Sequence, residues 1–330
     1  YDKRVEINWD ERGQEFLELI EEYRRHDGDN YDCVIPVSGG KDSTCQVIRI
    51  LQAGMNPLCV VATTDSLSSL GRKNIENIKS LGVDMVEYSL NPKVRRVMNR
   101  IGLEQIGDIS WPEHVAIFTV PIRVAVQFNI KLVVWGENSQ NEYGGPAASQ
   151  DSKILNRQWL EEFGGPLGLR VTDLIGQQGI KPRDLIPYTY PSNEELERVG
   201  VSGVFLGYYF PWDGMGNAIL AQSYGFQVLP TLVEGSLANY ENLDNHQTGI
   251  HDYFKYLKYG FGRATDIANN HIRRGRLSRS DAHNLVKKHD GIYPATCLGK
   301  PLSEILEEIE MTQEKFDDIC DRFTNKKVFR

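Results

Sequence analysis

Apolar, β-rich stretches alternate with helical stretches over the first 137 residues, and this order constrains the fold more than any other feature. Strands are predicted at residues 33–37, 57–64, 84–90 and 131–137, and helices at about 10–26, 42–54, 71–81 and 113–129. Strands that alternate with helices of about 10–15 residues build parallel sheets. We therefore expect an α/β fold with a parallel, Rossmann-like sheet that carries helices on both faces.

The second half of the chain has a different pattern. The stretch PYTYPSNEELERVG is typical of a loop that leads into a short helix, with Ser192 as N-cap and Glu195 completing a capping box. A fifth strand is predicted at 203–210, and residues 248–324 are mostly helical, with starts at Thr248, Ser278, Ser303 and Thr312. We expect a nucleotide-binding domain over residues 1–150 and a largely helical, substrate-binding part over residues 151–330.

Composition narrows the class of protein. The net charge is −8, whereas nucleic-acid binders usually carry a basic surplus, so we expect no nucleic-acid partner. No apolar run is long enough for a membrane span, and the first residues do not resemble a signal peptide. The five cysteines form no CxxC pair, which indicates a reducing cytoplasm with neither a disulfide framework nor a cysteine zinc site.

The loop SGGKDS lies where the first strand meets the following helix, which is where parallel sheets bind ligands. Two glycines let backbone N–H groups approach an anion, and the helix N-terminus adds a favourable dipole. The hydroxyls and the lysine add donors, and the aspartate can hold Mg²⁺ or orient the loop. The Walker pattern fails, because Ile35 replaces its first glycine and Asp42 separates lysine from serine. The predicted phosphate-binding residues are Ser38, Gly39, Gly40, Lys41, Asp42 and Ser43, with Asp42 also a metal ligand.

Two further loops leave the same edge of the predicted sheet. Asp65 follows the second strand, either near an adenosine or as an ordinary N-cap. Gly136 at the fourth strand exit permits close approach to a ligand, and Glu137 would place a carboxylate in the crevice. The alternative for this stretch is a polar surface loop. Lys41, Asp42 and Glu137 are the predicted catalytic residues.

The pattern S-G-G-x-D-S after a first strand resembles the loop of the N-type ATP pyrophosphatases, also called PP-loop enzymes. This family includes GMP, NAD, asparagine and argininosuccinate synthetases. The resemblance implies an adenine nucleotide alpha-hydrolase-like fold that uses ATP and Mg²⁺. It also implies that the loop holds the β- and γ-phosphates together, so that the α-phosphate is attacked and pyrophosphate leaves.

Four longer segments resemble a narrower group, the N-acetyl sugar amidotransferases, which help to make acetamidino sugars for bacterial surface glycans. They are VPIRVAVQFNIKLVVWGENSQNEYGG, VFLGYYFPWDGMGNAILAQSYGF, VEGSLANYENLDNHQTGIHDYFKYLKYGFGRATDIANNHIRRGR and YPATCLGKPLSEIL. The resemblance implies that an acetamido oxygen of a nucleotide sugar attacks ATP and that ammonia then displaces AMP. Such enzymes would be ATP-dependent C–N ligases, acting in the synthesis of O-antigen, capsule or flagellin glycans.

The resemblance also implies a source of ammonia. Members are thought to receive it from a glutaminase subunit with a cyclase-like partner, and this chain has no glutaminase nucleophile motif, since Cys297 lacks the G-x-C-x-G setting. Many similar proteins carry a cysteine-rich stretch before the WP near position 111. Here Ser110 and Glu113 flank that dipeptide, so the resemblance does not imply a structural zinc.

Candidate substrate residues are aromatic, polar or basic. Aromatic side chains stack on a sugar or a base but also pack in cores, and clustered amides and carboxylates favour a site. Basic side chains suit nucleotide phosphates or simply neutralise nearby acids. A metal held by His246 and His251 has poor helical geometry. The candidates are Asn138, Tyr143, Trp212, Glu234, Tyr240, Glu241, Asn242, His251, Lys258, Arg263 and Arg273.

Three rival functions stay open at this point. A tRNA-modifying PP-loop enzyme would adenylate a base carbonyl, but it would want a basic face and often a cysteine pair. A non-catalytic ATP-binding module and a glutamine-dependent synthetase of another small molecule are the others. The nucleotide sugar is also open between a CMP-linked nonulosonic acid and a UDP-linked diacetamido uronic acid.

Overall fold

A parallel sheet forms the centre of the computed structural model, which describes residues 7–137, 154–155 and 168–329. Its five parallel strands lie in the order β3-β2-β1-β4-β6, and the short β5 pairs antiparallel with β6 at one edge. The strands are β1 (Cys33–Pro36), β2 (Pro57–Thr63), β3 (Asp84–Ser89), β4 (Leu132–Trp135), β5 (Ile154–Leu155) and β6 (Ser202–Phe205). The predicted α/β class with a parallel sheet is confirmed.

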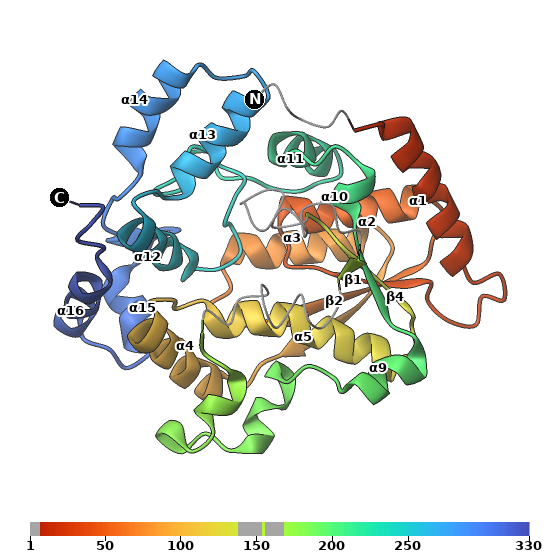
Figure 1. Cartoon of the computed structure of the whole chain (residues 1–330), viewed down its shortest axis with the longest axis horizontal. Coiled ribbons are helices and arrows are strands. Elements are labelled where there is room, and N and C mark those ends of the chain that lie inside the picture. Colours follow the sequence, from red (N-terminus) through yellow and green to blue (C-terminus); the bar gives the residue numbers. More distant parts are fainter. Residues whose placement is uncertain (1–6, 138–153, 156–167, 330) are drawn as a thin grey trace.

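Helices cover both faces of this sheet, as predicted, because alternate residues of each strand point to opposite sides. Along β1, Cys33 and Ile35 pack in one apolar cluster with α1 (Trp9–Tyr23), α2 (Lys41–Gln52) and α3 (Ser69–Ser80). Val34 packs in the other cluster, against α4 (Pro92–Ile106) and α5 (Trp111–Gln127). Figure 1 shows the two groups of helices on either side of the strands.

Two local predictions are corrected. The predicted strand 203–210 ends at Phe205, and α10 (Leu206–Tyr209) follows, closed by the Phe210 N–H donating to the Leu206 carbonyl at 3.0 Å. Helix α4 was not predicted, although Asn91 caps it and Gly107 ends it in the left-handed conformation.

The chain between β5 and the C-terminal helices forms short elements around the sheet. Ser192 and Glu195 make the predicted capping box at the start of α9. Helix α11 packs on α2 beside the first strand. These elements are η1 (Val171–Leu174), η2 (Gln177–Gly179), η3 (Pro182–Tyr188), α9 (Asn193–Val199) and α11 (Gly214–Ser223). Since β5 and β6 extend the sheet, it does not end at residue 150, where the sequence predicted a boundary.

The C-terminal part is largely helical, as predicted. Ser278 and Thr312 are N-caps, and a helix begins at Thr248, as predicted. Another helix begins at Leu302, which is one residue before the predicted start at Ser303. The elements are α12 (Thr248–Tyr259), α13 (Arg263–Arg273), α14 (Arg279–His289), β7 (Thr296–Cys297), β8 (Lys300–Pro301), α15 (Leu302–Glu308) and α16 (Gln313–Phe323). Among the described helices, none combines the length and apolarity that a membrane span requires.

Candidate functional site: a cavity at the carboxyl ends of the strands

A cavity of about 320 Å³ lies at the carboxyl ends of the parallel strands, where sheets of this kind bind ligands. It brings together residues from the loop after β1, from β4 and β6, from α5 and from the C-terminal part. Most of the predicted loop residues line it, together with predicted residues more than 190 positions away in the sequence. They are Ser38, Gly40, Lys41, Asp42, Ser43, Gly136, Glu137, Tyr240, Glu241, Asn242 and Arg263.

Side-chain hydroxyls of the loop after β1 form hydrogen bonds with the backbone of the same loop. Gly39 has a φ of +83°, and a Cβ there would meet Ile75 Cγ1 at 2.9 Å, so a larger residue does not fit. Gly40 is the N-cap of α2 and has no side chain to satisfy the first N–H groups of the helix. The Ser43 hydroxyl donates to the Gly40 carbonyl at 3.0 Å. The turn therefore points a helix N-terminus at the cavity, a geometry suited to an anion.

Lys41 lies inside the cavity between two carboxylates. Its Nζ is 2.5 Å from Asp42 Oδ2 and 3.0 Å from Glu241 Oε1, and only 9% of its side chain is exposed. The Asn217 amide on α11 donates to the other oxygen of Asp42 at 2.8 Å. Lys41 and Asp42 are thus held by Asn217 of α11 on one side and by Glu241 of the C-terminal part on the other.

Glu241 is an ionised carboxylate inside the cavity. Burial by itself would raise its pKa, but the nearby Lys41 and Arg263 outweigh burial, and the net pKa is lowered. Arg263 is shared between Glu241, at 3.8 Å, and Asp252, at 3.1 Å. The cavity therefore holds two cationic side chains in places where a phosphate or carboxylate could replace Glu241 as their partner.

Tyr240 and Asn242 flank Glu241 in the sequence, and their side chains make different contacts. The Tyr240 ring centroid is 6.0 Å from Lys41 Nζ, and burial raises the pKa of its hydroxyl to about 12, so it stays protonated. Asn242 has a φ of +55° and donates to Asp252 Oδ2 at 2.7 Å. Asp252 therefore holds both Asn242 and Arg263 at the cavity.

Hydrogen bonds to the loop after β2 fix the segment that carries Glu241. The Ser68 N–H donates to the Asp244 carbonyl at 2.7 Å, and the His246 N–H donates to the Ser66 carbonyl at 3.1 Å. A Cβ on Gly71 would lie 2.6 Å from Asp244 Cα, so the close approach needs a glycine. Asp244 lines the cavity and its pKa is raised by burial, although the sequence analysis did not select it.

Gly136 lines the cavity, but close approach of a ligand is not the only reason for a glycine at this position. A Cβ at Gly136 would lie 2.1 Å from Gln46 Nε2 and 3.0 Å from Trp212 Cζ2, so protein side chains already require the glycine. Gln46 was missed by the sequence analysis. It is 6% exposed and lines the cavity, and its Oε1 has no hydrogen-bond partner among the described residues. A buried acceptor without a partner in the described part of the chain therefore lies on a side chain at the cavity wall.

Asp65 does not line the cavity in this structure. Its two oxygens bind Arg95, at 2.5 Å, and Arg96, whose Nε donates at 2.8 Å. Burial opposes ionisation of Asp65, but the two arginines lower its pKa overall. Here Asp65 is a partner of a buried arginine rather than a free adenosine-binding group.

Other predicted substrate residues lie away from the cavity. Trp212 packs in the core beneath Gly136, and Glu234 accepts hydrogen bonds from Thr296 and from the Leu298 and Gly299 N–H groups. Lys258 donates to a backbone carbonyl on the α4 side, Arg273 is exposed, and His251 belongs to a separate cluster. Asn138 and Tyr143 fall outside the described residues.

Comparisons with known proteins bear mainly on the C-terminal part. No curated protein matches the chain. The solved structure of NMN synthetase from Francisella tularensis has a TM-score of 0.30 at 14% identity and covers 68% of this chain and 99% of its own. NAD⁺ synthetase from Burkholderia pseudomallei has a TM-score of 0.26 at 13% identity, covering 66% and 88%. Likenesses this distant say nothing about what this chain binds.

A family model gives a more informative match. The family described as LPS biosynthesis protein WbpG-like, C-terminal domain, matches residues 234–330. This range contains Tyr240, Glu241, Asn242 and Arg263 of the cavity and overlaps the last two of the four segments that resemble N-acetyl sugar amidotransferases. Residues 234–330 are therefore similar to the WbpG-like C-terminal domain of LPS biosynthesis proteins.

Proposed function

We propose that this protein is an ATP-dependent amidotransferase that converts an acetamido group of a nucleotide-activated sugar into an acetamidino group. The observation that carries the proposal is the 3.0 Å contact between Lys41 Nζ, in the phosphate-type loop, and Glu241 Oε1, in the WbpG-like domain. Because both residues line one cavity, a nucleotide on the loop and a group bound to the C-terminal domain would meet there.

The loop supports binding of a polyphosphate. The N-terminus of α2, the two serines and Lys41 supply donors and positive charge on one side of the cavity. Mg²⁺ on a nucleotide takes most of its ligands from phosphate and water and one or two from carboxylates. Asp42, at the cavity edge, fits that role if Lys41 turns from it towards the phosphates.

The proposed reaction has two steps. The acetamido oxygen attacks the α-phosphorus of ATP, so an O–P bond forms while the bond to the β-phosphate oxygen breaks and pyrophosphate leaves. Ammonia then adds to the imidate carbon, and the C–O bond breaks with its electron pair leaving on AMP. The first step is needed because an amide oxygen is a poor leaving group until it is phosphorylated. Lys41 and the helix N-terminus would stabilise the charge on pyrophosphate.

The buried environment of all five cysteines supports an external source of ammonia. Each is free and buried, and burial raises the pKa of each thiol, to about 12 for Cys59, Cys297 and Cys320. A glutaminase cysteine must instead be accessible and form a thiolate easily. We propose that a separate glutaminase subunit delivers ammonia to this chain, with a cyclase-like partner, in the cytoplasm.

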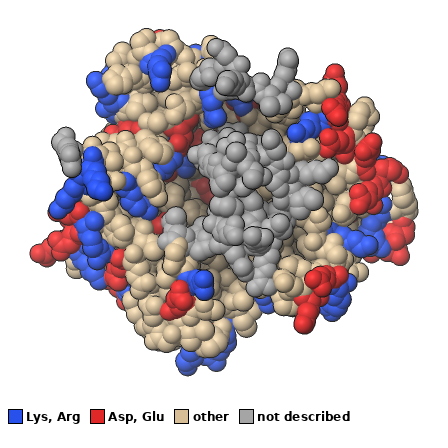
Figure 2. All heavy atoms as spheres, in the orientation of Figure 1, with Lys and Arg blue, Asp and Glu red and all other residues tan. Residues whose placement is uncertain are grey.

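Surface charge favours a small substrate over tRNA. On the face seen in Figure 2, Lys and Arg side chains are interspersed with acidic ones, and acidic side chains gather over α1. RNA-modifying enzymes need a continuous basic surface to hold the phosphate backbone. The alternative of a tRNA-modifying enzyme predicts turnover with tRNA and no nucleotide sugar.

The test is to incubate the protein with ATP, Mg²⁺, ammonium and either a CMP-linked nonulosonic acid or a UDP-linked diacetamido uronic acid. We expect AMP, pyrophosphate and a sugar product in which the carbonyl oxygen is replaced by NH, detected by mass spectrometry. Lys41→Ala should lower pyrophosphate release by about 100-fold or more, whereas Lys73→Ala, at an exposed position on α3, should not. Release of ADP and phosphate, or turnover of tRNA alone, would exclude the proposal.

A further inference from the structure

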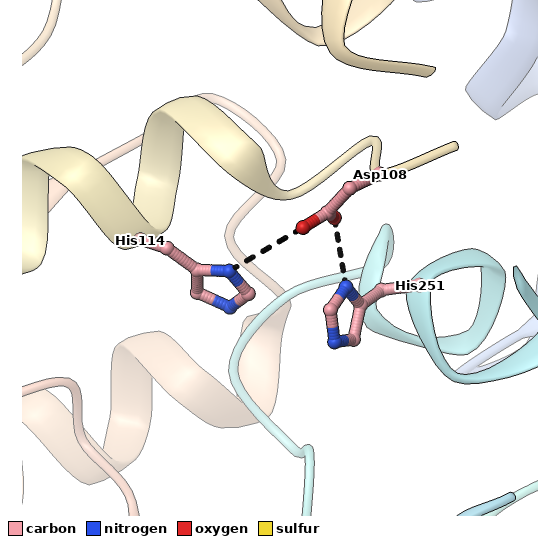
Figure 3. Close-up of side chains that lie close together, drawn as sticks. All are labelled: Asp108, His114 and His251. Carbon is pink, nitrogen blue, oxygen red and sulfur yellow. Dashed lines mark hydrogen bonds and ion pairs between the residues drawn. The ribbon is translucent and has the colours of Figure 1, made fainter. Parts of the chain in front are cut away.

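Two histidines and an aspartate form a cluster outside the residues that line the cavity. His251 Nδ1 lies 2.8 Å from Asp108 Oδ1, and His114 Nδ1 lies 3.8 Å from Asp108 Oδ2. The two imidazole rings meet edge to face, with centroids 5.0 Å apart. Figure 3 shows both rings turning one nitrogen to the carboxylate and the other away from it.

Asp108 fixes the tautomer of His251. The carboxylate is 2% exposed and also accepts from the Ser110 N–H at 2.9 Å, so its position is set by the loop before α5. An ionised carboxylate can only accept, so neutral His251 donates from Nδ1 and keeps its lone pair on Nε2. That Nε2 has no hydrogen-bond partner within the described parts of the chain.

The cluster adjoins residues that line the cavity. On α5, His114 is followed at the spacing of one helical face by Ile117, Phe118 and Pro121, all of which line the cavity. His114 therefore lies one turn further along the same helical face, and its ring meets that of His251 edge to face. Next to His251 in the chain, Asp252 holds Arg263, which lines the cavity from the other side.

The charged groups around His251 come from several elements. Asp108 and His114 face it from the α4–α5 loop and α5, Asp252 and Lys258 lie on its own helix, and Arg263 faces it from α13. Burial lowers the pKa of His251, but Asp108 outweighs burial and the net pKa is raised above 6.5. Burial lowers the pKa of His114 to about 4, so the neighbouring ring stays neutral at physiological pH. The Asp108 anion therefore makes the His251 imidazole a stronger base than it would be without that partner.

We propose that His251 is the general base for the attacking ammonia and that Asp108 positions it, an inference that rests on the proposed function. As the nitrogen of ammonia bonds to the carbon of the adenylated imidate, that nitrogen becomes positively charged. His251 Nε2 takes one of its protons, the C–O bond breaks, and AMP leaves with the electron pair. The proton then passes from His251 to water, so the step consumes no oxidant or reductant.

The test separates the two half-reactions in the full-length protein. With ATP, Mg²⁺ and the acetamido nucleotide sugar, exchange of labelled pyrophosphate into ATP reports adenylation alone. His251→Ala should keep this exchange within a few-fold of wild type but lower amidine formation by about 100-fold or more. Added imidazole should restore part of the loss, because it replaces a missing base but not a missing structural contact. His283→Ala, at an exposed histidine on α14, is the matched control and should behave as wild type.

The pH profile gives a second readout. At a fixed concentration of unprotonated ammonia, the wild-type amidation rate should rise as pH passes the His251 pKa, because only neutral imidazole accepts a proton. In His251→Ala this rise should be absent. In Asp108→Asn it should move to lower pH and reach a lower plateau, because the anion that raises the His251 pKa is gone.

Three outcomes would overturn the inference. If His251→Ala forms amidine at the wild-type rate, His251 is not the base. If it loses pyrophosphate exchange and amidine formation equally, it acts in adenylation or folding. If the dialysed protein holds one zinc per chain that both His251→Ala and chelation remove, the cluster is a metal site. A wild-type protein that performs no pyrophosphate exchange with either nucleotide sugar would instead reject the proposed function, and this inference with it.

Discussion

Lys41 is the side chain on which the cavity's charge balance depends. Its ammonium lies between Asp42 and Glu241, and Arg263 is the other cation close to Glu241. Breaking a buried ion pair from one side is costly because the remaining charge stays buried without compensation. A triphosphate would replace Glu241 as the partner of Lys41 while Arg263 stays beside Glu241, so that binding exchanges one anion for another at Lys41.

This arrangement predicts that stability and catalysis can be separated at Lys41. Lys41→Ala should lower the free energy of unfolding by about 1–3 kcal/mol, because the cation that then remains near Glu241 among the described residues is the more distant Arg263. Adding Glu241→Gln should recover much of that loss, because the uncompensated charge is then removed. Urea unfolding of the two single variants and the double variant measures this coupling. Pyrophosphate release should remain lost in the double variant.

Two outcomes of these experiments would contradict the role assigned to Lys41. If Lys41→Ala and Glu241→Gln have additive effects on unfolding, the 3.0 Å contact between the two residues contributes nothing to stability. If the double variant regains pyrophosphate release, Lys41 acts only by neutralising Glu241 and does not contact phosphate.

The positions of single residues at the cavity could be predicted where the signal was local. The loop Ser38–Ser43 could be placed from sequence because its residue types are adjacent and follow a strand. Asp65 shows the limit, since its arginine partners lie about 30 positions further along the chain. Gln46 could not be selected, because a glutamine on a helix carries no sign that its amide will be buried beside Gly136.

At the scale of elements, the turn between β1 and α2 depends on a backbone conformation that favours glycine. Gly39 has a φ of +83°, and its Cα faces Ile75 of α3 and the Gly71 carbonyl. The loop is therefore packed against α3 as well as shaped for an anion. This packing restricts the conformations that the predicted phosphate-binding turn can adopt.

Gly39→Ala should consequently destabilise the protein by more than about 1 kcal/mol, since it adds backbone strain and a Cβ at 2.9 Å from Ile75. Gly13→Ala on α1 should instead stabilise it by about 0.5–1 kcal/mol, because a Cβ there meets nothing within 4 Å and the position is helical. Thermal unfolding of both variants tests the difference. Equal effects would show that the turn is not held in its left-handed conformation.

Strands and helices with strong periodicity were predicted closely, and the misses have physical causes. Helix α4 carries its signals in its ends, Asn91 and Gly107, rather than in a clean apolar stripe, and its interior buries Arg95 and Asn99. A buried arginine looks like a surface residue in sequence. The strand after residue 202 was predicted too long because the apolar run continues into α10, where only the hydrogen-bond pattern changes.

At the scale of the whole molecule, the WbpG-like domain shares its core with the rest of the chain. Leu103 of α4 and Ile109 are fully buried in the apolar cluster formed by α12, α15 and α16. Arg95 donates to Gln247 at 3.4 Å, and an isolated bridge pairs Leu67 with Asn245. These contacts come from sequence positions more than 140 residues apart, which explains why composition alone could not show how the two parts meet.

Residues 234–330 expressed alone should therefore not fold cooperatively, although the family match begins and ends there. Without α4, the cluster of α12, α15 and α16 would expose the apolar surface that Leu103 and Ile109 cover, and Gln247 would lose its buried arginine. The full chain should unfold in one thermal transition, while the fragment should show a broad, non-cooperative change by circular dichroism. Leu103→Ala should lower the transition of the full chain, and the exposed Leu232→Ala is its control. A sharp transition in the fragment at the temperature of the full chain would contradict this prediction. It would mean that residues 234–330 fold by themselves, and that the contact between Lys41 and Glu241 joins two independent units.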